Sequence, residues 1–71
     1  MEIVEIFKAL SDESRLRIIN ILKEKKMCVC DIENILELPQ ANVSRHLSRL
    51  KSVGLIKSEK KSQWVYFWIN E

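Results

Sequence analysis

Apolar residues in the first third of the chain recur with the period of an amphipathic α-helix. A helix over about residues 2–10 is predicted, because four apolar residues follow the spacing i, i+3, i+4, i+7. These four are Ile3, Ile6, Phe7 and Leu10. Ser11 or Asp12 can then cap a second helix, whose apolar residues cover most of its circumference and predict a central core helix. They are Leu16, Ile18, Ile19, Ile21 and Leu22.

The middle of the chain has the spacing of a helix-turn-helix. Asp31 can cap or charge-stabilise the start of a third helix. Its inward residues are expected to be Ile32, Ile35 and Leu36. This helix stops at Leu38-Pro39, because proline disfavours helical geometry in the preceding residue and suits the first turn of a following helix. A tight turn therefore joins the third helix to a fourth.

The fourth helix is predicted to run from about Gln40 to Val53. Its inward residues follow the spacing i, i+4, i+7 and are Val43, Leu47 and Leu50. Gly54 ends the helix, since glycine takes the left-handed conformation common at helix C-termini.

The last part of the chain predicts a β-hairpin. Residues 55–59 and 63–69 are rich in β-branched and aromatic side chains, and the polar residues 60–62 separate them. Strand alternation places Val65, Phe67 and Ile69 on one face and Trp64, Tyr66 and Trp68 on the other. Both faces are apolar, so both need cover. The expected fold is mainly α with a small β-hairpin (α+β): a winged helix-turn-helix of four helices followed by a two-stranded wing.

Composition narrows the classes of function. The 71 residues fit one domain, residues 1–71, and a core of this size favours assembly with a partner. The single glycine excludes the Gly-rich phosphate cradles of nucleotide enzymes, and one histidine with two cysteines is too few for a closed four-ligand zinc site. No stretch approaches the roughly 18 apolar residues of a membrane span, so we expect no membrane association.

Charge is distributed unevenly along the chain. Residues 1–38 carry six basic and eight acidic side chains, whereas residues 39–71 carry six basic and two acidic ones. This asymmetry indicates an acidic partner for the C-terminal half.

The two cysteines lie two residues apart, in a short junction over residues 27–30 that we expect to be extended. Cys28 and Cys30 are too close for an easy disulfide in regular structure, and a reducing cytoplasmic location fits them best. On an ideal helix or strand their side chains would diverge, so chelation of one ion requires distorted backbone. A frayed start to the third helix supplies it, and a helix N-terminus favours the thiolate that binds soft ions.

The polar side of the fourth helix carries groups that bind bases and phosphates in the major groove of double-stranded DNA. The candidates are Gln40, Asn42, Ser44, Arg45, His46, Ser48 and Arg49. Lys60 and Lys61 at the hairpin tip could meet the adjacent DNA backbone. A merely solvated helix face is the alternative, but the turn, the hairpin and the charge asymmetry together favour DNA. A catalytic role for His46 is not expected, since no carboxylate lies three or four residues away to orient it.

Four segments resemble the ArsR/SmtB family of metal-responsive winged-helix repressors. They are FKALSDESRLRI at 7–18, CVCDI at 28–32, VSRHL at 43–47 and GLI at 54–56. The resemblance covers nearly the whole chain. It implies a homodimeric repressor, not an enzyme, that occupies operator DNA near its own promoter and leaves when an inducer binds. CVCDI is most similar to the branch that senses arsenite, antimonite or soft divalent metals. As(III), Sb(III) or such a metal at Cys28 and Cys30 is therefore the implied inducer, with no cofactor required.

The chain departs from the family pattern in two respects. Arsenite sensors of this branch commonly have a third cysteine three positions after the second, where this chain has Glu33. Cadmium- and lead-sensing relatives add cysteines from an N-terminal extension, and this chain has none before Cys28. What remains is a two-thiolate site, completed by water, Glu33 or a partner subunit. The alternative is that both cysteines are retained for packing.

The family usually continues beyond the second hairpin strand into a dimerisation helix, whereas this chain ends at Glu71. We therefore expect the first helix, through Ile3, Phe7 and Leu10, to carry more of a dimer contact, with the Trp64/Tyr66/Trp68 face as an additional surface. Two other functions stay open: a winged-helix protein-interaction module that does not bind DNA, and a thiol redox switch without metal sensing.

Overall fold

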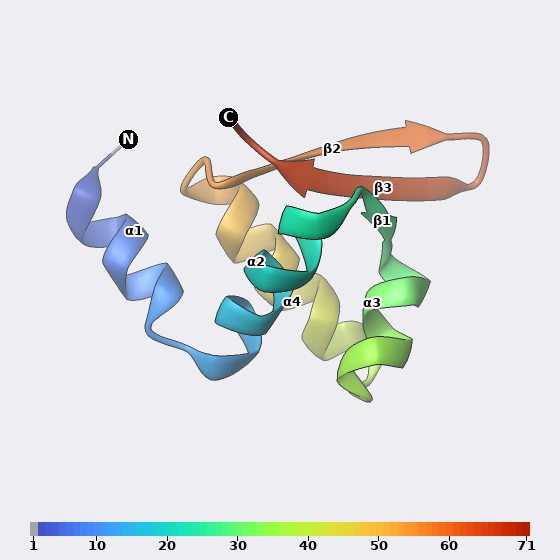
Figure 1. The fold of residues 1–71 in the computed structure, drawn as a ribbon, viewed down its shortest axis with the longest axis horizontal. Helices are drawn as coiled ribbons and strands as arrows, with labels where there is room; N and C mark the ends of the chain where they lie inside the picture. The colour runs from blue at the N-terminus through green and yellow to red at the C-terminus, as the bar shows by residue number, and fades with distance from the viewer. Residues whose placement is uncertain (1) are drawn as a thin grey trace.

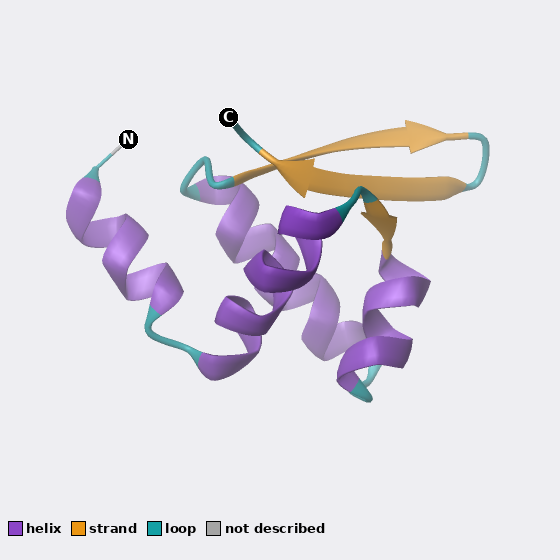
Figure 2. Ribbon diagram, in the orientation of Figure 1, coloured by secondary structure: helices purple, strands orange, loops and turns teal. Residues whose placement is uncertain are grey.

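Three helices pack beneath a small sheet, and a fourth helix lies at one end of the molecule (Figures 1 and 2). The computed structural model describes residues 2–71, and Met1, the first residue of the predicted domain 1–71, lies outside them. The elements in chain order are α1 (Ile3–Leu10), α2 (Glu13–Glu24), β1 (Met27–Cys28), α3 (Val29–Leu36), α4 (Gln40–Ser52), β2 (Ile56–Lys61) and β3 (Trp64–Ile69). The prediction of four helices followed by a hairpin is confirmed.

The sheet is antiparallel, with the strand order β1-β3-β2. The hairpin pairs β2 with β3 from Ile56 opposite Ile69 to Lys61 opposite Trp64. β1 pairs on the other side of β3, with Met27 opposite Phe67 and Cys28 opposite Tyr66. Sequence analysis expected only an extended junction here. The short strand instead ties the chain between α2 and α3 to the wing.

Both ends of α4 have the expected turn chemistry. Pro39, with φ −59°, precedes its first residue, and the Pro39 carbonyl accepts hydrogen bonds from the backbone N–H groups of Asn42 and Val43. At the other end Gly54 has φ 82°, and the Leu55 N–H donates to the Leu50 carbonyl at 3.1 Å. This is the Schellman arrangement, in which a left-handed residue satisfies the last carbonyls of a helix.

The turn between α3 and α4 begins one residue earlier than predicted. Glu37, rather than Leu38, ends the helical run, in the left-handed conformation with φ 56° and ψ 43°. Its N–H donates to the Glu33 carbonyl at 2.8 Å. A second short turn therefore closes the helix before Pro39 starts the next one.

One core joins the helices to the inner face of the sheet. Its apolar residues come from all seven elements and from Val53 directly after α4. They are Ala9, Ile18, Leu22, Met27, Ile32, Leu36, Val43, Leu47, Leu50, Val53, Ile56 and Phe67. The predicted inward residues of α4 are thus all buried, and Phe67 is the residue that β3 contributes to the core.

Three sequence expectations need correction. Leu16 and Ile35 are 47% and 46% exposed, because α2 and α3 each bury only the stripe that faces the other helices and the sheet. Residues adjacent in a helix point about 100° apart, so Ile35 leaves the stripe that holds Leu36. α2 is therefore not a central helix buried around most of its circumference. Asp31 does not cap α3, because the helix begins at Val29 with Cys28 at the N-cap position. It lies in the first turn, where its charge can stabilise the helix start as the alternative expectation held.

The sequence predicts no membrane-spanning segment, and the lengths and polarity of the helices test this. None of the helices within residues 2–71 combines the length and the apolar character needed to cross a bilayer.

Asp12 caps α2, as one of the two expected capping residues. Its Oδ1 accepts a hydrogen bond from the Arg15 backbone N–H at 3.1 Å, and this bond is the main reason that the Asp12 pKa is lowered. Ser11 instead donates its hydroxyl to the Lys8 carbonyl at the end of α1, at 2.7 Å.

Replacing the cap should lower stability in a pH-dependent way. Asp12→Ala is expected to reduce the free energy of unfolding by about 1 kcal/mol at pH 7, measured by urea denaturation, whereas Asp12→Asn keeps most of the cap. Because the folded-state pKa is lowered, the charge-dependent part is present above the unfolded pKa and is lost as pH falls through the folded pKa. Equal midpoints for all three proteins at pH 7 would refute the cap.

Candidate nucleic-acid interface and thiol pair

α4 is anchored on one side and projects polar groups on the others. Val43, Leu47 and Leu50 are buried in the core, so the helix cannot rotate without exposing them. The remaining positions fall on three sides: one toward the wing, one outward, and one toward α1 and α2.

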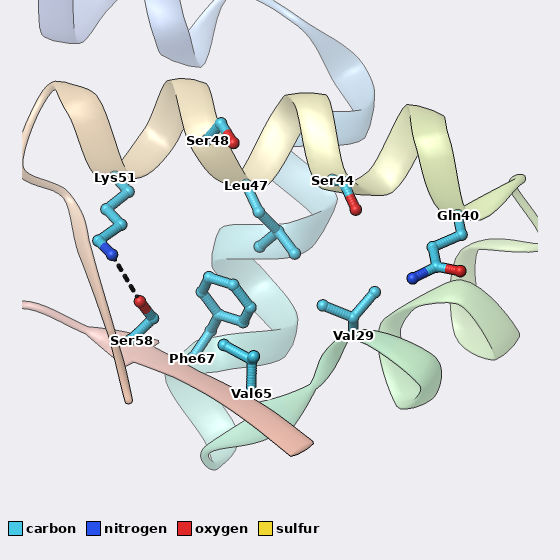
Figure 3. A pocket seen from close by; sticks show the side chains of 9 residues that line it. All are labelled: Val29, Gln40, Ser44, Leu47, Ser48, Lys51, Ser58, Val65 and Phe67. Carbon is cyan, nitrogen blue, oxygen red and sulfur yellow. Dashed lines mark hydrogen bonds between the residues drawn. The ribbon is translucent and has the colours of Figure 1, made fainter. Parts of the chain in front are cut away.

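The side toward the wing borders a cleft of about 380 Å³. Gln40, Ser44, Ser48 and Lys51 line it from α4, and Ser58, Val65 and Phe67 line it from the wing (Figure 3). Val29 and Leu47 complete the lining. The cleft thus has an apolar floor and a rim of amide, hydroxyl and ammonium groups.

Lys51 and Ser58 also border this cleft, and neither was among the residues predicted from the sequence. The Lys51 ammonium donates to the Ser58 hydroxyl at 2.8 Å and bridges the end of α4 to β2 (Figure 3). The helical period could have identified Lys51. It lies eleven residues after Gln40, which is close to three full turns, so both side chains lie on the same side of the helix. Nothing local in the sequence identifies Ser58.

Arg45 points outward and is exposed, as is Ser48 at the edge of the cleft. Neither side chain makes a hydrogen bond or ion pair within the part of the chain that the structure describes. Arg45 therefore keeps its full donor capacity for a partner.

The flank toward α1 and α2 is different, because two of its predicted DNA-binding residues are engaged within the chain. The Arg49 guanidinium donates to a Glu5 carboxylate oxygen at 2.9 Å, and His46 Nδ1 lies 3.4 Å from the Arg15 guanidinium. The hydrogen bond from Arg49, followed by the charge of Lys8, lowers the Glu5 pKa. Asn42 is half-buried on the same flank. The seven candidates of α4 are therefore spread around the helix rather than gathered on one face.

The basic residues of the wing lie slightly off their expected place. Lys60 and Lys61 belong to β2, opposite Val65 and Trp64, and the turn itself is Ser62-Gln63. Ser62 has φ 60°, the sign that two-residue hairpin turns require. Both lysines are exposed beside the turn, with Lys61 3.9 Å from Glu59. The tip of the wing remains basic.

The two cysteine sulfurs lie side by side. Cys28 Sγ and Cys30 Sγ are 3.0 Å apart, and neither is in a disulfide. Cys28 ends β1 and is also the N-cap of α3, with φ −87° and ψ 166°, while Cys30 is the second residue of the helix. The change from extended to helical backbone between them turns both side chains to one side. The irregular start of α3 thus supplies the geometry that a regular helix or strand could not.

Protonation at this pair differs from the sequence expectation. The pKa of Cys28 is raised, first by its hydrogen bond with Cys30 and then by burial, while the Asp31 backbone N–H acts in the opposite direction. The start of the helix therefore does favour the thiolate, as expected, but at Cys28 the hydrogen bond with Cys30 and burial outweigh it. The thiol is the stable form at neutral pH, and an ion that binds the sulfur must displace the proton.

A second cavity, of about 290 Å³, opens above the sulfurs. It is lined by Cys28, Val29, Cys30, Glu33, Gln40, Gln63, Trp64 and Val65. Soft sulfur donors 3.0 Å apart in one cavity fit a thiophilic ion. Among residues 2–71, however, no third His, Cys, Asp or Glu joins them to form a ready three-residue metal cluster. Glu33 borders the cavity without completing such a cluster.

Part of the surface predicted for dimerisation is exposed to solvent. Ile3 and Phe7 are 63% and 65% exposed on α1, and Val4 is exposed beside them. Leu10 instead packs against the core, because the end of α1 meets α2 around the fully buried Ala9. On the wing, Trp64 is 46% exposed, and Lys26 lies 4.6 Å from the ring centroid of Trp68, which is half-buried.

Comparisons with known proteins agree on one family. A family model described as "Bacterial regulatory protein, arsR family" matches residues 12–58. The "Cadmium resistance transcriptional regulatory protein CadC homolog" of Staphylococcus aureus is 40% identical across 100% of this chain and 60% of its own length. The "Arsenical resistance operon repressor" of Escherichia coli is 40% identical across 90% of this chain and 56% of its own length. The chain thus spans little more than half of these curated relatives.

Solved structures show the same fold. HlyU from Vibrio cholerae superposes with a TM-score of 0.92 at 32% identity, over 96% of this chain and 74% of that one. A homodimeric winged helix-turn-helix DNA-binding domain from Mycobacterium bovis, described as a possible ArsR-family regulator, also gives 0.92, at 26% identity over 97% and 64%.

The two thiols should differ in reactivity toward an alkylating agent. Under native conditions at pH 7.5, Cys30 should be labelled before Cys28, because Cys28 is buried and its pKa is raised. The difference should shrink as pH rises toward the Cys28 pKa and vanish in denaturant. Mass spectrometry of peptides after timed iodoacetamide treatment measures both rates, and faster labelling of Cys28 in the folded protein would contradict the geometry.

Proposed function

Because this chain belongs to the arsR family of bacterial regulatory proteins, we propose that it is a transcriptional repressor that binds operator DNA as a homodimer and is released by a thiophilic ion. The observation that carries the proposal is the side of α4 that joins exposed Arg45 and Ser48 to the cleft beside the basic wing. The role is binding rather than catalysis, and no catalytic residue is assigned. The cytoplasm is the location that this proposed action on DNA would require.

α4 would enter the major groove with its outward and wing-facing sides. Arg45 can bond a guanine with two donors, and Gln40 can pair with adenine through its amide. Ser44 and Ser48 would meet base edges or phosphates, while Lys60 and Lys61 bind the DNA backbone beside the groove. The cleft between α4 and the wing separates these two sets of contacts.

The flank residues would act at the edge of the groove. Asn42 and His46 would approach the opposite phosphate backbone, and Arg49 would do so by exchanging Glu5 for a phosphate. Until then the Glu5 pair neutralises Arg49 and orients α4 against α1. Base reading therefore falls mainly to Gln40 and Arg45.

Dimerisation would use the exposed apolar face of α1. Ile3, Val4 and Phe7 form this face, and α1 lies at the end of the molecule away from the wing turn (Figure 1). A two-fold pair of α4 helices would then reach successive major grooves about 34–36 Å apart on an inverted repeat.

The effector would bind at Cys28 and Cys30. A soft divalent ion fits the pair, with water, Glu33 or a partner subunit filling its remaining positions. As(III) and Sb(III) are the other candidates, and both cadmium- and arsenic-resistance regulators are among the relatives. The close sulfurs also favour a second function, a redox switch in which a peroxide takes two electrons from the thiols, giving a disulfide and water.

DNA recognition is tested by separating base contacts from phosphate contacts. On an inverted repeat selected by the protein from random duplexes, Arg45→Ala should lose about tenfold or more in preference over random DNA, the scale of one bidentate base contact. Lys60→Ala should weaken binding to every sequence and lower the salt slope by about one. Fluorescence anisotropy at several salt concentrations measures both effects.

The wild-type protein and a single half-site serve as controls for that experiment. The isolated half-site should bind more weakly and without cooperativity if the dimer is the binding unit. Equal affinity of the wild type for the selected repeat and for random DNA at matched salt would refute sequence-specific recognition.

Effector release is tested by adding ions to the protein–DNA complex. Cadmium should weaken DNA binding by about 5- to 150-fold, the usual range of allosteric coupling, and Cys28→Ser should abolish this effect while leaving ion-free DNA binding intact. Arsenite and zinc are compared in the same assay. Release by cadmium that persists in Cys28→Ser would remove that thiol from the mechanism. Release by mild peroxide alone, reversed by a reductant, would favour the redox switch.

A further inference from the structure

The thiol cavity and the cleft beside α4 are neighbours with shared walls. Three residues line both of them: Val29, Gln40 and Val65. Two of these are apolar side chains. Gln40 alone among the three brings groups that can donate and accept hydrogen bonds.

Gln40 stands where the two spaces meet. It is the first residue of α4, and Pro39 before it has a fixed φ of −59° that holds the helix start in place. Figure 3 shows the Gln40 amide at one end of the cleft, on the side of Val29. The residue is exposed, and within residues 2–71 its amide makes no side-chain hydrogen bond. Its amide is therefore uncommitted in the ion-free protein.

We propose that Gln40 couples the thiol pair to DNA binding. Its amide hydrogen-bonds to the DNA when the thiol cavity is empty, and to the groups around the bound ion when the cavity is filled. This inference rests on the proposed function, and it names the residue that transmits regulation between the two sites. The side chain takes one rotamer at a time, so its amide group is directed either toward the cleft beside α4 or toward the thiol cavity. An ion held by Cys28 and Cys30 would bring hydrogen-bond partners to the thiol side.

The rest of α4 is poorly placed to transmit the signal by moving as a body. Val43, Leu47 and Leu50 are buried, so a shift of the helix would disturb the core. The pairs Arg49–Glu5 and Arg15–His46 also hold the helix against α1 and α2. Rotation of one exposed side chain disturbs none of these contacts. Differential contact of one residue with the two ligands is sufficient for coupling between sites.

The test compares Gln40→Leu with the wild type. Leucine keeps the size and helix propensity of glutamine but removes its hydrogen-bonding groups. DNA affinity is measured by anisotropy with and without cadmium, and cadmium binding is followed separately by the ultraviolet absorption of its bonds to sulfur. Ser48→Ala is the matched control, because Ser48 lines the cleft but not the thiol cavity.

In the wild type, cadmium should weaken DNA binding by about 5- to 150-fold, and DNA should weaken cadmium binding by the same factor. In Gln40→Leu both factors should fall to about one, while the absorption of cadmium–sulfur bonds persists. Ser48→Ala should bind DNA more weakly but keep the wild-type factor. An unchanged factor in Gln40→Leu would overturn the inference and leave the proposed repressor intact. Failure of cadmium to release the wild type would instead refute ion regulation itself, and the coupling with it.

Discussion

The pairing of β1 with β3 is the contact on which the geometry of both sites depends. Only Met27 and Cys28 take part, but they join the start of α3 to the middle of the wing. Met27 and Phe67 are opposite each other and both belong to the core, so the wing is held over the helices. The same pairing keeps Cys28 extended immediately before a helix begins, and that change of backbone brings the two sulfurs together. The thiol pair and the cleft between α4 and the wing thus both depend on one short strand.

The distribution of charged residues over the fold is a second constraint, which the net charge does not show. The chain carries only +2, yet its acidic N-terminal half meets its basic C-terminal half at Glu5 and Arg49. This pair occupies the flank of α4 that faces α1. Arg45 on the outward side and Lys60 at the wing have no such partner within residues 2–71. In the described part of the chain, Arg45 and Lys60 therefore stay unpaired on the outer and wing sides of α4, whereas the flank toward α1 is neutralised.

Helical periodicity was sufficient to predict the helices and the buried residues of α4, because these depend on neighbours within one or two turns. It could not predict β1, since two residues show no alternation and their partners lie some forty positions later. The exposure of Leu16 and Ile35 likewise depends on which neighbours cover α2 and α3. Among the site residues, the type of group was predictable but its partner was not. The engagement of Arg49 by Glu5, and the position of Gln40 between two cavities, arise only from tertiary packing.

The surroundings of Trp64 differ from those of the second tryptophan of the wing. Its indole lines the thiol cavity, whereas Trp68 lies near the other end of the same strand, beneath Lys26. The only two tryptophans of the chain therefore occupy chemically different surroundings on one face of β3. An ion bound at the sulfurs would share its cavity with the first indole but not with the second. The two indoles therefore offer separate intrinsic probes, one inside the cavity and one outside it.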